Sequence, residues 1–253
     1  MSVHRLTQEA FLYNEYGLLE NTRLQAAFDG LVFLLDHRFP GYGREKSLLD
    51  QWDICARYLP HVSALTRVFK KFLNSDSPSG RIRSSEAFVG LLTKASWYLQ
   101  EIGDLRACSN LLQIACDACE DKTSLIYAYL CNTHVVVAVD ENDMSKAQKY
   151  STKAIAIREN RLASDDLDLA ISYNNYGIAL LNEGRYDESL ANLMLSDSIW
   201  ADTGLDDETY KALTYLNTGR VYSLKGDVDL AIPYFKKAEI TFSRISNNVF
   251  LIG

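Results

Sequence analysis

Apolar residues recur along this 253-residue chain at the spacing of one helix face, and no alternation of strand type persists for any length. Two apolar stripes cover about residues 6–19 and 22–39, which predicts an antiparallel pair of amphipathic helices. The loop Phe39-Pro40-Gly41-Tyr42-Gly43 should end the second helix, because proline lacks a backbone donor and restricts the residue before it. Helix is predicted to resume near Ser47, to turn at Pro60 and to continue through Phe69. The pattern therefore predicts an all-α chain.

The residues at 170–190 recur at fixed offsets on both sides. A forward shift of 42 positions (226 − 184) places Gly184 on Gly226, and a backward shift of 42 (184 − 142) places it on Asn142. A further backward step of 39 (142 − 103) reaches Gly103. Copies at a nearly constant period indicate stacked helix pairs, and these offsets predict about four of them.

Residue types within each copy fit a pair of helices joined by a tight turn. Gly or Asn at the turn position accepts the left-handed backbone that ends a helix, and an Asp follows in three copies, where it can cap the next helix. Gly177 and Gly219 are small enough to let the helices of neighbouring units approach closely, whereas Leu193 and Phe235 would fill the space between them.

This pattern resembles the tetratricopeptide repeat, most clearly in the positions Tyr215, Gly219, Tyr222, Gly226, Ala231, Phe235 and Ala238. The period of about 42 exceeds the usual 34 residues and is similar to that of kinesin-light-chain-like repeats. The resemblance covers roughly residues 84–246 and is degenerate in the first two copies. It implies a right-handed superhelical solenoid whose concave groove binds a peptide or a partner protein.

The region before the repeats carries a second resemblance, in His4-Arg5-Leu6-Thr7-Gln8-Glu9, Phe39-Pro40, Trp52, Cys55 and Tyr58-Leu59-Pro60-His61-Val62. These residues look like the segment that joins the nucleotide-binding module to the repeats in fungal NLR-like signalling ATPases of the STAND class. The resemblance implies the sensor arm of such a protein. The sequence holds no Gly-x-x-x-x-Gly-Lys-Ser/Thr loop, so ATP hydrolysis is not carried over.

Composition suggests four segments along the chain. Residues 1–73 are predicted to form an N-terminal helical cap, and the polar, Ser-rich and Gly-containing stretch at 74–84 is predicted to be a linker. Residues 85–246 form the predicted repeat array, and 247–253 form a C-terminal tail. Because the end of a solenoid exposes apolar surface unless it is capped, a homodimer through the C-terminal end of the array is one of the partner hypotheses.

Charge is unevenly distributed in a chain whose net charge is −7. Residues 1–83 hold 11 Lys/Arg against 9 Asp/Glu, and the remainder holds 15 against 24. An acidic repeat region repels phosphate backbones, so no nucleic-acid partner is expected. Apolar runs such as Leu31–Leu35 are too short to span a membrane, and the N-terminus lacks the apolar core of a secretory signal. A cytoplasmic protein without a membrane partner is expected.

Catalytic and metal-binding motifs are weak. Cys116-x-x-Cys119 followed by Cys131-x-x-His134 has the ligand types of a zinc site, but these cysteines fall on helices where buried Cys packs as a small apolar residue. The four His residues are scattered and form no triad or His-Glu-x-x-His motif. We therefore expect no catalytic residue, no metal and no cofactor.

The inward face of each first helix supplies the predicted binding groove, which comprises Trp97, Tyr129, Asn132, Asn174, Asn175, Ile178, Leu213, Asn217 and Arg220. An Asn side chain donates and accepts at once, which suits pairing with the backbone of an extended peptide. The interleaved apolar residues would form pockets for its side chains. The alternative is that Asn only satisfies neighbouring helices.

A non-enzymatic interaction module is the leading functional hypothesis. The alternative is a small-molecule-binding protein or an enzyme on a repurposed repeat scaffold, for example a cyclase or pericyclase of secondary metabolism. That activity would use an apolar pocket under the N-terminal cap, because such a step needs shape and a hydrogen bond more than a nucleophile. A closed, dry pocket would favour this alternative over an open groove.

Overall fold

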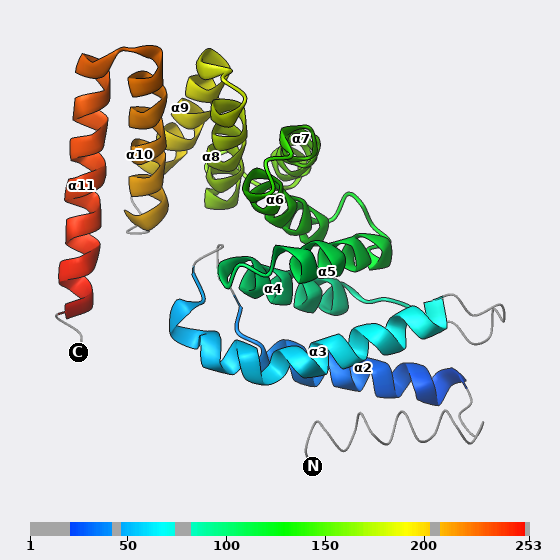
Figure 1. Ribbon diagram of the computed structural model, residues 1–253. Helices are drawn as coiled ribbons and strands as arrows, with labels where there is room; N and C mark the ends of the chain where they lie inside the picture. The colour runs from blue at the N-terminus through cyan, green and yellow to red at the C-terminus, as the bar shows by residue number, and fades with distance from the viewer. Residues whose placement is uncertain (1–20, 42–46, 74–81, 203–207, 251–253) are drawn as a thin grey trace. The chain divides into compact units, whose positions relative to one another are not determined.

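The computed structural model describes residues 21–41, 47–73, 82–202 and 208–250, and every regular element in these ranges is helical (Figure 1). The elements in chain order are α2 (Asn21–Arg38), η2 (Leu49–Gln51), α3 (Trp52–Leu73), α4 (Glu86–Glu101), α5 (Leu105–Ala118), α6 (Leu125–Asp140), α7 (Met144–Arg161), α8 (Leu167–Asn182), α9 (Tyr186–Asp202), α10 (Glu208–Lys225) and α11 (Val228–Phe250). The predicted all-α fold is confirmed, and the helix expected at 6–19 lies outside the described residues.

Contacts divide the chain into two compact units, Met1–Thr133 and His134–Gly253, with the boundary inside α6. Most of the predicted linker, residues 74–81, and the last three residues lie outside the described ranges. The helical backbone of α11 reaches Phe250, so it includes part of the segment expected as a tail. The four predicted segments stay predictions.

Three phenylalanines form the aromatic centre of the first unit. Phe28 on α2, Phe69 on α3 and Phe88 on α4 are all buried, with ring centroids 4.8–6.0 Å apart. Such aromatic pairs add to the free energy gained from removing apolar surface from water. The contacts hold α2 and α3 against α4.

Helix α3 corrects the predicted turn at Pro60, because it runs unbroken from Trp52 to Leu73 with Pro60 inside it. A proline inside a helix removes one backbone hydrogen bond at a substantial cost in free energy. Burial of Val62, Leu65 and Phe69 along the following turns offsets that cost. The apolar face therefore prevails over the local preference of proline.

Glu101, at the end of α4, joins the start of α3 to the repeat helices. Its carboxylate accepts hydrogen bonds from the backbone N–H of Leu48 at 2.9 and 3.0 Å, from Trp52 Nε1 at 2.9 Å and from Trp97 Nε1 at 2.8 Å. Hydrogen bonds to a charged acceptor are stronger than those between neutral groups. One acidic side chain thus positions η2, α3 and α4 together.

The four predicted turn positions all have a positive φ angle. The values are 79° at Gly103, 58° at Asn142, 76° at Gly184 and 89° at Gly226, so the prediction of left-handed turns is confirmed. The predicted Asp caps are present where α5 and α7 begin: Asp104 accepts from the N–H of Ala107, and Asp143 accepts from that of Lys146, each at 3.0 Å.

Close approach occurs at both predicted glycines, but it joins the two helices of one pair, α8 with α9 and α10 with α11, and not helices of neighbouring units as expected. A Cβ atom added at Gly177 would lie 2.8 Å from Leu193 Cγ, and one added at Gly219 would lie 2.8 Å from two ring atoms of Phe235. Leu193 is fully buried, and Ser189 Oγ donates to the Gly177 carbonyl at 2.7 Å across the same pair, α8 and α9. Only a residue without a side chain fits at these two positions.

The second unit also contains a buried cation. Arg158 on α7 is fully buried, and its Nη1 donates to the Asp168 carbonyl and to Ser172 Oγ on α8, both at 2.6 Å. The guanidinium therefore fixes α7 against α8. Within the described ranges, no helix is long and apolar enough to cross a membrane.

Replacement of Gly219 by Ala tests the helix contact. The clash with Phe235 should outweigh the roughly 1 kcal/mol that Ala gains over Gly in a helix, and we expect a net loss of about 1–3 kcal/mol in the free energy of unfolding. Gly30→Ala is the matched control, because nothing lies within 4 Å of that position on the exposed side of α2. The control should gain about 0.5–1 kcal/mol. Urea unfolding, followed by far-UV circular dichroism, measures the free energy of unfolding of both variants. A change of the same sign in both would contradict the close contact between Gly219 and Phe235.

Replacement of Glu101 by Gln tests the carboxylate anchor. The amide nitrogen would face N–H donors, so we expect a loss of about 1–3 kcal/mol in the free energy of unfolding. Urea unfolding monitored by Trp fluorescence provides the measurement, since Trp52 and Trp97 both contact this carboxylate. Glu120→Gln, at an exposed position, should stay within about 0.5 kcal/mol of the parent chain. Equal stabilities of the two variants would show that Glu101 is not an anchor.

Candidate binding face on α8 and α10

Six of the predicted groove residues share one face of the second unit. The α8/α10 face is defined here by Asn174, Asn175 and Ile178 on α8 and by Leu213, Asn217 and Arg220 on α10. Spacings of three and four residues place the side chains of each helix on one side. The two helices are in contact, as the hydrogen bonds between them show.

Amide groups form a chain of hydrogen bonds across this face. Asn217 Nδ2 donates to Asn174 Oδ1 at 3.2 Å, and Asn174 Nδ2 donates to Asn175 Oδ1 at 3.3 Å. Arg220 Nη1 donates to Asn217 Oδ1 at 3.2 Å, which continues the chain toward solvent. The network ties α8 to α10 through side chains alone.

Thr214 and Ser196 extend the network inward, and neither was among the predicted site residues. The Thr214 hydroxyl lies 3.4 Å from Asn174 Oδ1, 2.9 Å from the Tyr210 carbonyl and 3.2 Å from Ser196 Oγ. All of these polar groups are buried or nearly so. Thr214 lies three positions before Asn217 and therefore on the same side of the helix. This spacing is the signal in the sequence that could have indicated that Thr214 belongs to the network.

The network leaves part of the face for a ligand. Asn174 and Asn217 are 2% and 4% exposed and bond to each other, which favours the alternative interpretation that they satisfy neighbouring helices. Asn175, 8% exposed, has an Nδ2 group that donates to no described residue. Arg220 is exposed, and its guanidinium has further N–H donors beyond the one that it uses. Ile178 and Leu213 are half-buried.

The three predicted groove residues of the first unit take structural positions. Trp97 is buried and donates to Glu101, and Asn132 is only 1% exposed. Tyr129 is half-buried, and its carbonyl accepts from the Thr133 hydroxyl at 3.1 Å. These residues belong to the first compact unit, whereas the α8/α10 face belongs to the second.

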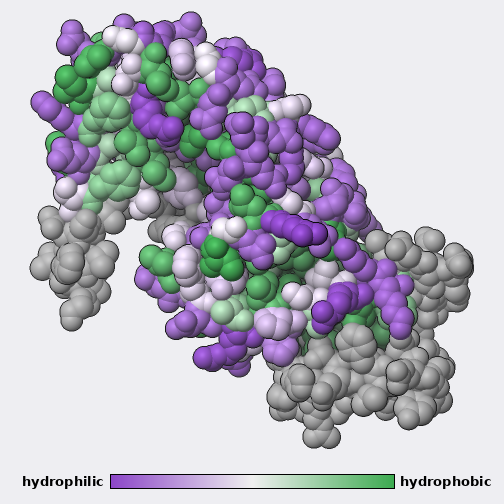
Figure 2. Space-filling model, in the orientation of Figure 1, coloured by the Kyte–Doolittle hydropathy of each residue, from purple (hydrophilic) through white to green (hydrophobic). Residues whose placement is uncertain are grey.

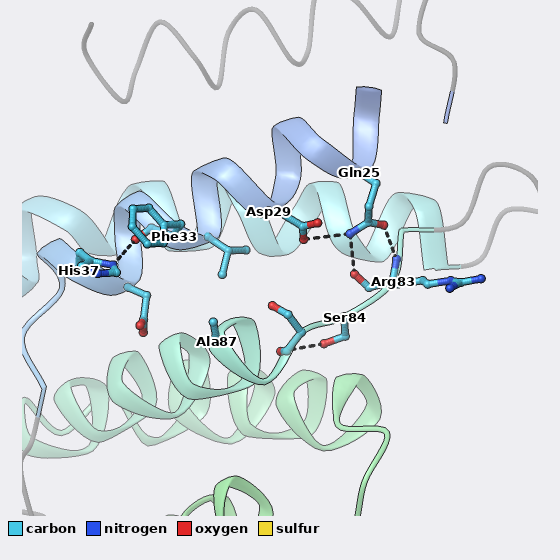
Figure 3. Close-up of a pocket in the computed structure, with 10 residues that line it drawn as sticks. Gln25, Asp29, Phe33, His37, Arg83, Ser84 and Ala87 are labelled. Carbon is cyan, nitrogen blue, oxygen red and sulfur yellow. Dashed lines mark hydrogen bonds between the residues drawn. The ribbon is translucent and has the colours of Figure 1, made fainter. Parts of the chain in front are cut away.

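A groove in the first unit lies between α2 and the start of α4 (Figure 3). Its volume is about 470 Å³, and its lining mixes Val32, Phe33 and Ala87 with polar and charged side chains. Phe33 is 60% exposed and contacts the tilted ring of His37, whose Nδ1 lies 2.8 Å from the Phe33 carbonyl. Asp36, on the same wall, pairs with Lys94 at 2.7 Å. The groove is an open trough rather than a closed, dry pocket.

All five cysteines lie in the described part of the chain, where each is buried and none forms a disulfide. Burial and the nearby Glu101 carboxylate raise the pKa of the Cys55 thiol to about 11, and burial also raises the pKa of the Cys119 thiol. Both thiols therefore stay protonated near neutral pH. Among the described residues, no group of three or more His, Cys, Asp and Glu is placed to hold a metal ion.

Replacement of Asn174 by Ala tests the amide network. It would leave the Asn217 amide N–H group and Asn175 Oδ1 without their partner, and we expect a loss of about 1–3 kcal/mol in the free energy of unfolding. Asn192→Ala is the control, since that exposed amide bonds only within its own helix, at the Glu188 carbonyl. The control should change stability by less than about 0.5 kcal/mol. Urea unfolding measures the stability of both variants. If Asn174→Ala is as stable as the parent chain, the amide network does not stabilise the fold.

Comparison with known proteins places this face in a region that matches a repeat family. Residues 168–239 match the sequence model of the tetratricopeptide repeat family, a range that includes most of α8, α9 and α10 and about half of α11. No curated protein sequence matches the chain.

Solved structures share the fold at low sequence identity. BtubC (BKLC) from P. vanneervenii is 15% identical, with a TM-score of 0.58 over 96% of this chain and 89% of that one. The putative kinesin light chain of Podosopora anserina, described as having nearly identical TPR-like repeats, is 15% identical, with a TM-score of 0.55 over 78% and 96%. MamA is 20% identical, with a TM-score of 0.50 over 76% and 94%. The chain thus has the all-helical fold of tetratricopeptide-repeat structures, and residues 168–239 carry the sequence pattern of that repeat.

Proposed function

We propose that the protein is a non-enzymatic interaction module that binds a peptide or a partner helix on the α8/α10 face. The observation that carries the proposal is the position of two hydrogen-bond donors, Asn175 Nδ2 and the Arg220 guanidinium, on a face that also presents Ile178 and Leu213. The tetratricopeptide fold supports it, because this fold is typical of protein-interaction scaffolds.

The chemistry of the face suits an extended peptide. Carbonyl groups of a peptide backbone would accept from Asn175 and Arg220 whatever the peptide sequence, and apolar peptide side chains would pack on Ile178 and Leu213. The buried Asn174 and Asn217 amides would hold the donors in place rather than contact the peptide. A rigid face loses little conformational entropy on binding, which favours affinity.

Peptide selection against the whole chain tests this function. Peptides enriched from a random display library should bind at least tenfold more weakly to the Asn175→Ala/Arg220→Ala double variant, because two directed hydrogen bonds are lost. Ile178→Ala should weaken binding by a similar factor through lost apolar contact. Fluorescence anisotropy of the labelled peptides measures each affinity.

Leu195→Ala is the matched control for Ile178→Ala, because Leu195 is a large apolar residue that is 48% exposed on α9. It should bind the selected peptides as the parent chain does. Equal affinities for all the variants would refute the assignment of binding to α8 and α10, even if peptides are enriched.

The finer context of the chain is part of the same proposal. The resemblance of the N-terminal segment supports a role as the sensor arm of an NLR-like signalling protein in the cytoplasm.

Figure 2 shows hydrophobic residues gathered where α10 and α11 join, and Leu224, Val228, Leu230 and Ile232 are exposed there. This apolar surface supports a homodimer through the C-terminal end of the array.

The alternative function is binding of an apolar small molecule, with or without a reaction such as cyclisation. The α2/α4 groove favours it by size, because its 470 Å³ falls within the roughly 300–1,000 Å³ of ligand sites. The charged lining and open form of the groove are less suited to an apolar ligand. A chain that enriches no peptides but is stabilised by apolar ligands would support the alternative.

A further inference from the structure

A second cavity lies between α10 and α11, on the side of α10 opposite the α8/α10 face. It measures about 240 Å³ and is lined by Lys211, Tyr215, Lys237, Ile240, Thr241 and Arg244. Tyr215 and Asn217 are two positions apart, which turns their side chains by about 200° around the helix axis. This basic cavity is therefore separate from the proposed peptide face.

Positive charge dominates the basic cavity. Three of its six lining side chains are cationic, and none is acidic. In the described part of the chain, neither Lys211 nor Lys237 forms an ion pair within 4 Å. Asp197 on α9 interacts electrostatically with both lysines. The lining of the cavity is thus positive in a chain whose net charge is −7.

Aromatic residues fix the geometry of the basic cavity. The Lys237 ammonium lies 5.2 Å from the ring centroid of Tyr215 and 5.1 Å from that of Tyr234, within the range of cation–π attraction. Tyr215 donates its hydroxyl hydrogen bond to Asp197, and burial and this carboxylate raise the pKa of Tyr215 to about 12. The phenol therefore stays protonated and keeps the cavity wall in place.

The preceding repeat shows that these cations are not needed for the fold. Moving back by 42 positions (226 − 184), Tyr215 corresponds to Tyr173, which also bonds to an acidic residue of the preceding helix, Glu159, at 2.7 Å. The three cations correspond to Leu169, Leu195 and Asp202. A tyrosine–carboxylate bond thus occurs in both helix pairs, whereas the three cations occur in the α10/α11 pair and not in the α8/α9 pair.

We propose that the basic cavity binds the phosphate monoester of a phosphorylated side chain on a protein partner. At 240 Å³ the cavity is smaller than sites for drug-sized ligands, so it fits a single group of a larger partner. A phosphate monoester carries about −1.5 to −2 charges at pH 7 and three acceptor oxygens. It is opposite in charge to the lining of the cavity and offers three acceptor oxygens, whereas a carboxylate supplies a single charge and two oxygens.

Titration of the isotope-labelled full chain tests the proposal by NMR at constant ionic strength. The probes are the tripeptide Gly-phosphoserine-Gly, its unphosphorylated form and inorganic phosphate. The phosphorylated tripeptide should shift amide signals of α10 and α11 around the basic cavity, and the unphosphorylated form should not. Tighter binding of the phosphorylated tripeptide than of inorganic phosphate supports a phosphorylated partner.

Charge-matched variants locate the site. Lys211→Gln/Lys237→Gln should bind the phosphorylated tripeptide about tenfold more weakly, whereas Lys149→Gln/Lys236→Gln, with the same charge change at exposed positions, should bind it normally. Circular dichroism checks that both variants keep their helicity. The Asn175→Ala/Arg220→Ala variant should also bind it normally, so failure of the proposed peptide function would not affect this result.

Three outcomes would overturn the proposal. The first is the absence of localised shifts, and the second is an equal loss of binding in both charge variants, which would indicate general electrostatic attraction. The third is inorganic phosphate binding as tightly as the phosphorylated tripeptide, which would identify a site for the free ion rather than for a modified protein.

Discussion

The helix pairs α8/α9 and α10/α11 each depend on a glycine of the first helix that lies against a large apolar side chain of the second. Gly177 meets Leu193 in this way, and Gly219 meets Phe235, with no room for a Cβ atom in either pair. The separation between paired helices follows from this contact. The left-handed turn residues then reverse the chain within a few positions. Because two successive pairs are built alike, their first helices, α8 and α10, can bond to one another.

This construction separates the residues that build the fold from those that can vary. Tyr173 and Tyr215 occupy equivalent positions, and each bonds to a carboxylate of the preceding helix, although the two acidic residues, Glu159 and Asp197, are not at equivalent positions. The positions around them differ completely, with Leu169, Leu195 and Asp202 in one repeat and Lys211, Lys237 and Arg244 in the next. The surface of a repeat can therefore change its chemistry while the interior stays the same.

The helix turns and caps could be predicted from the amino-acid sequence because they depend on residues close together in the chain. Turn residues such as Gly226 and caps such as Asp143 act on neighbours within a few positions, so their roles follow directly from their types. Pro60 was misread because its local preference is outweighed by the burial of the residues that follow it.

The candidate site was only partly predictable, because its interactions join residues far apart in the chain. The hydrogen bond from Asn217 to Asn174 spans 43 positions, and the bond from Trp52 to Glu101 spans 49. Periodicity identified the helix face that carries these Asn residues, but not which amides bond to each other. The basic cavity was missed for the same reason, since its cations come from two helices.

Helix α10 carries both surfaces, with Asn217 and Arg220 on one side and Lys211 and Tyr215 on the other. A helix in a close-packed interior moves as one body, because Gly219 and Phe235 leave no slack between α10 and α11. A rotation or slide of α10 induced on one side must therefore displace groups on the other. Thermodynamic linkage makes any such coupling reciprocal, so each occupant would alter the affinity of the other by the same factor.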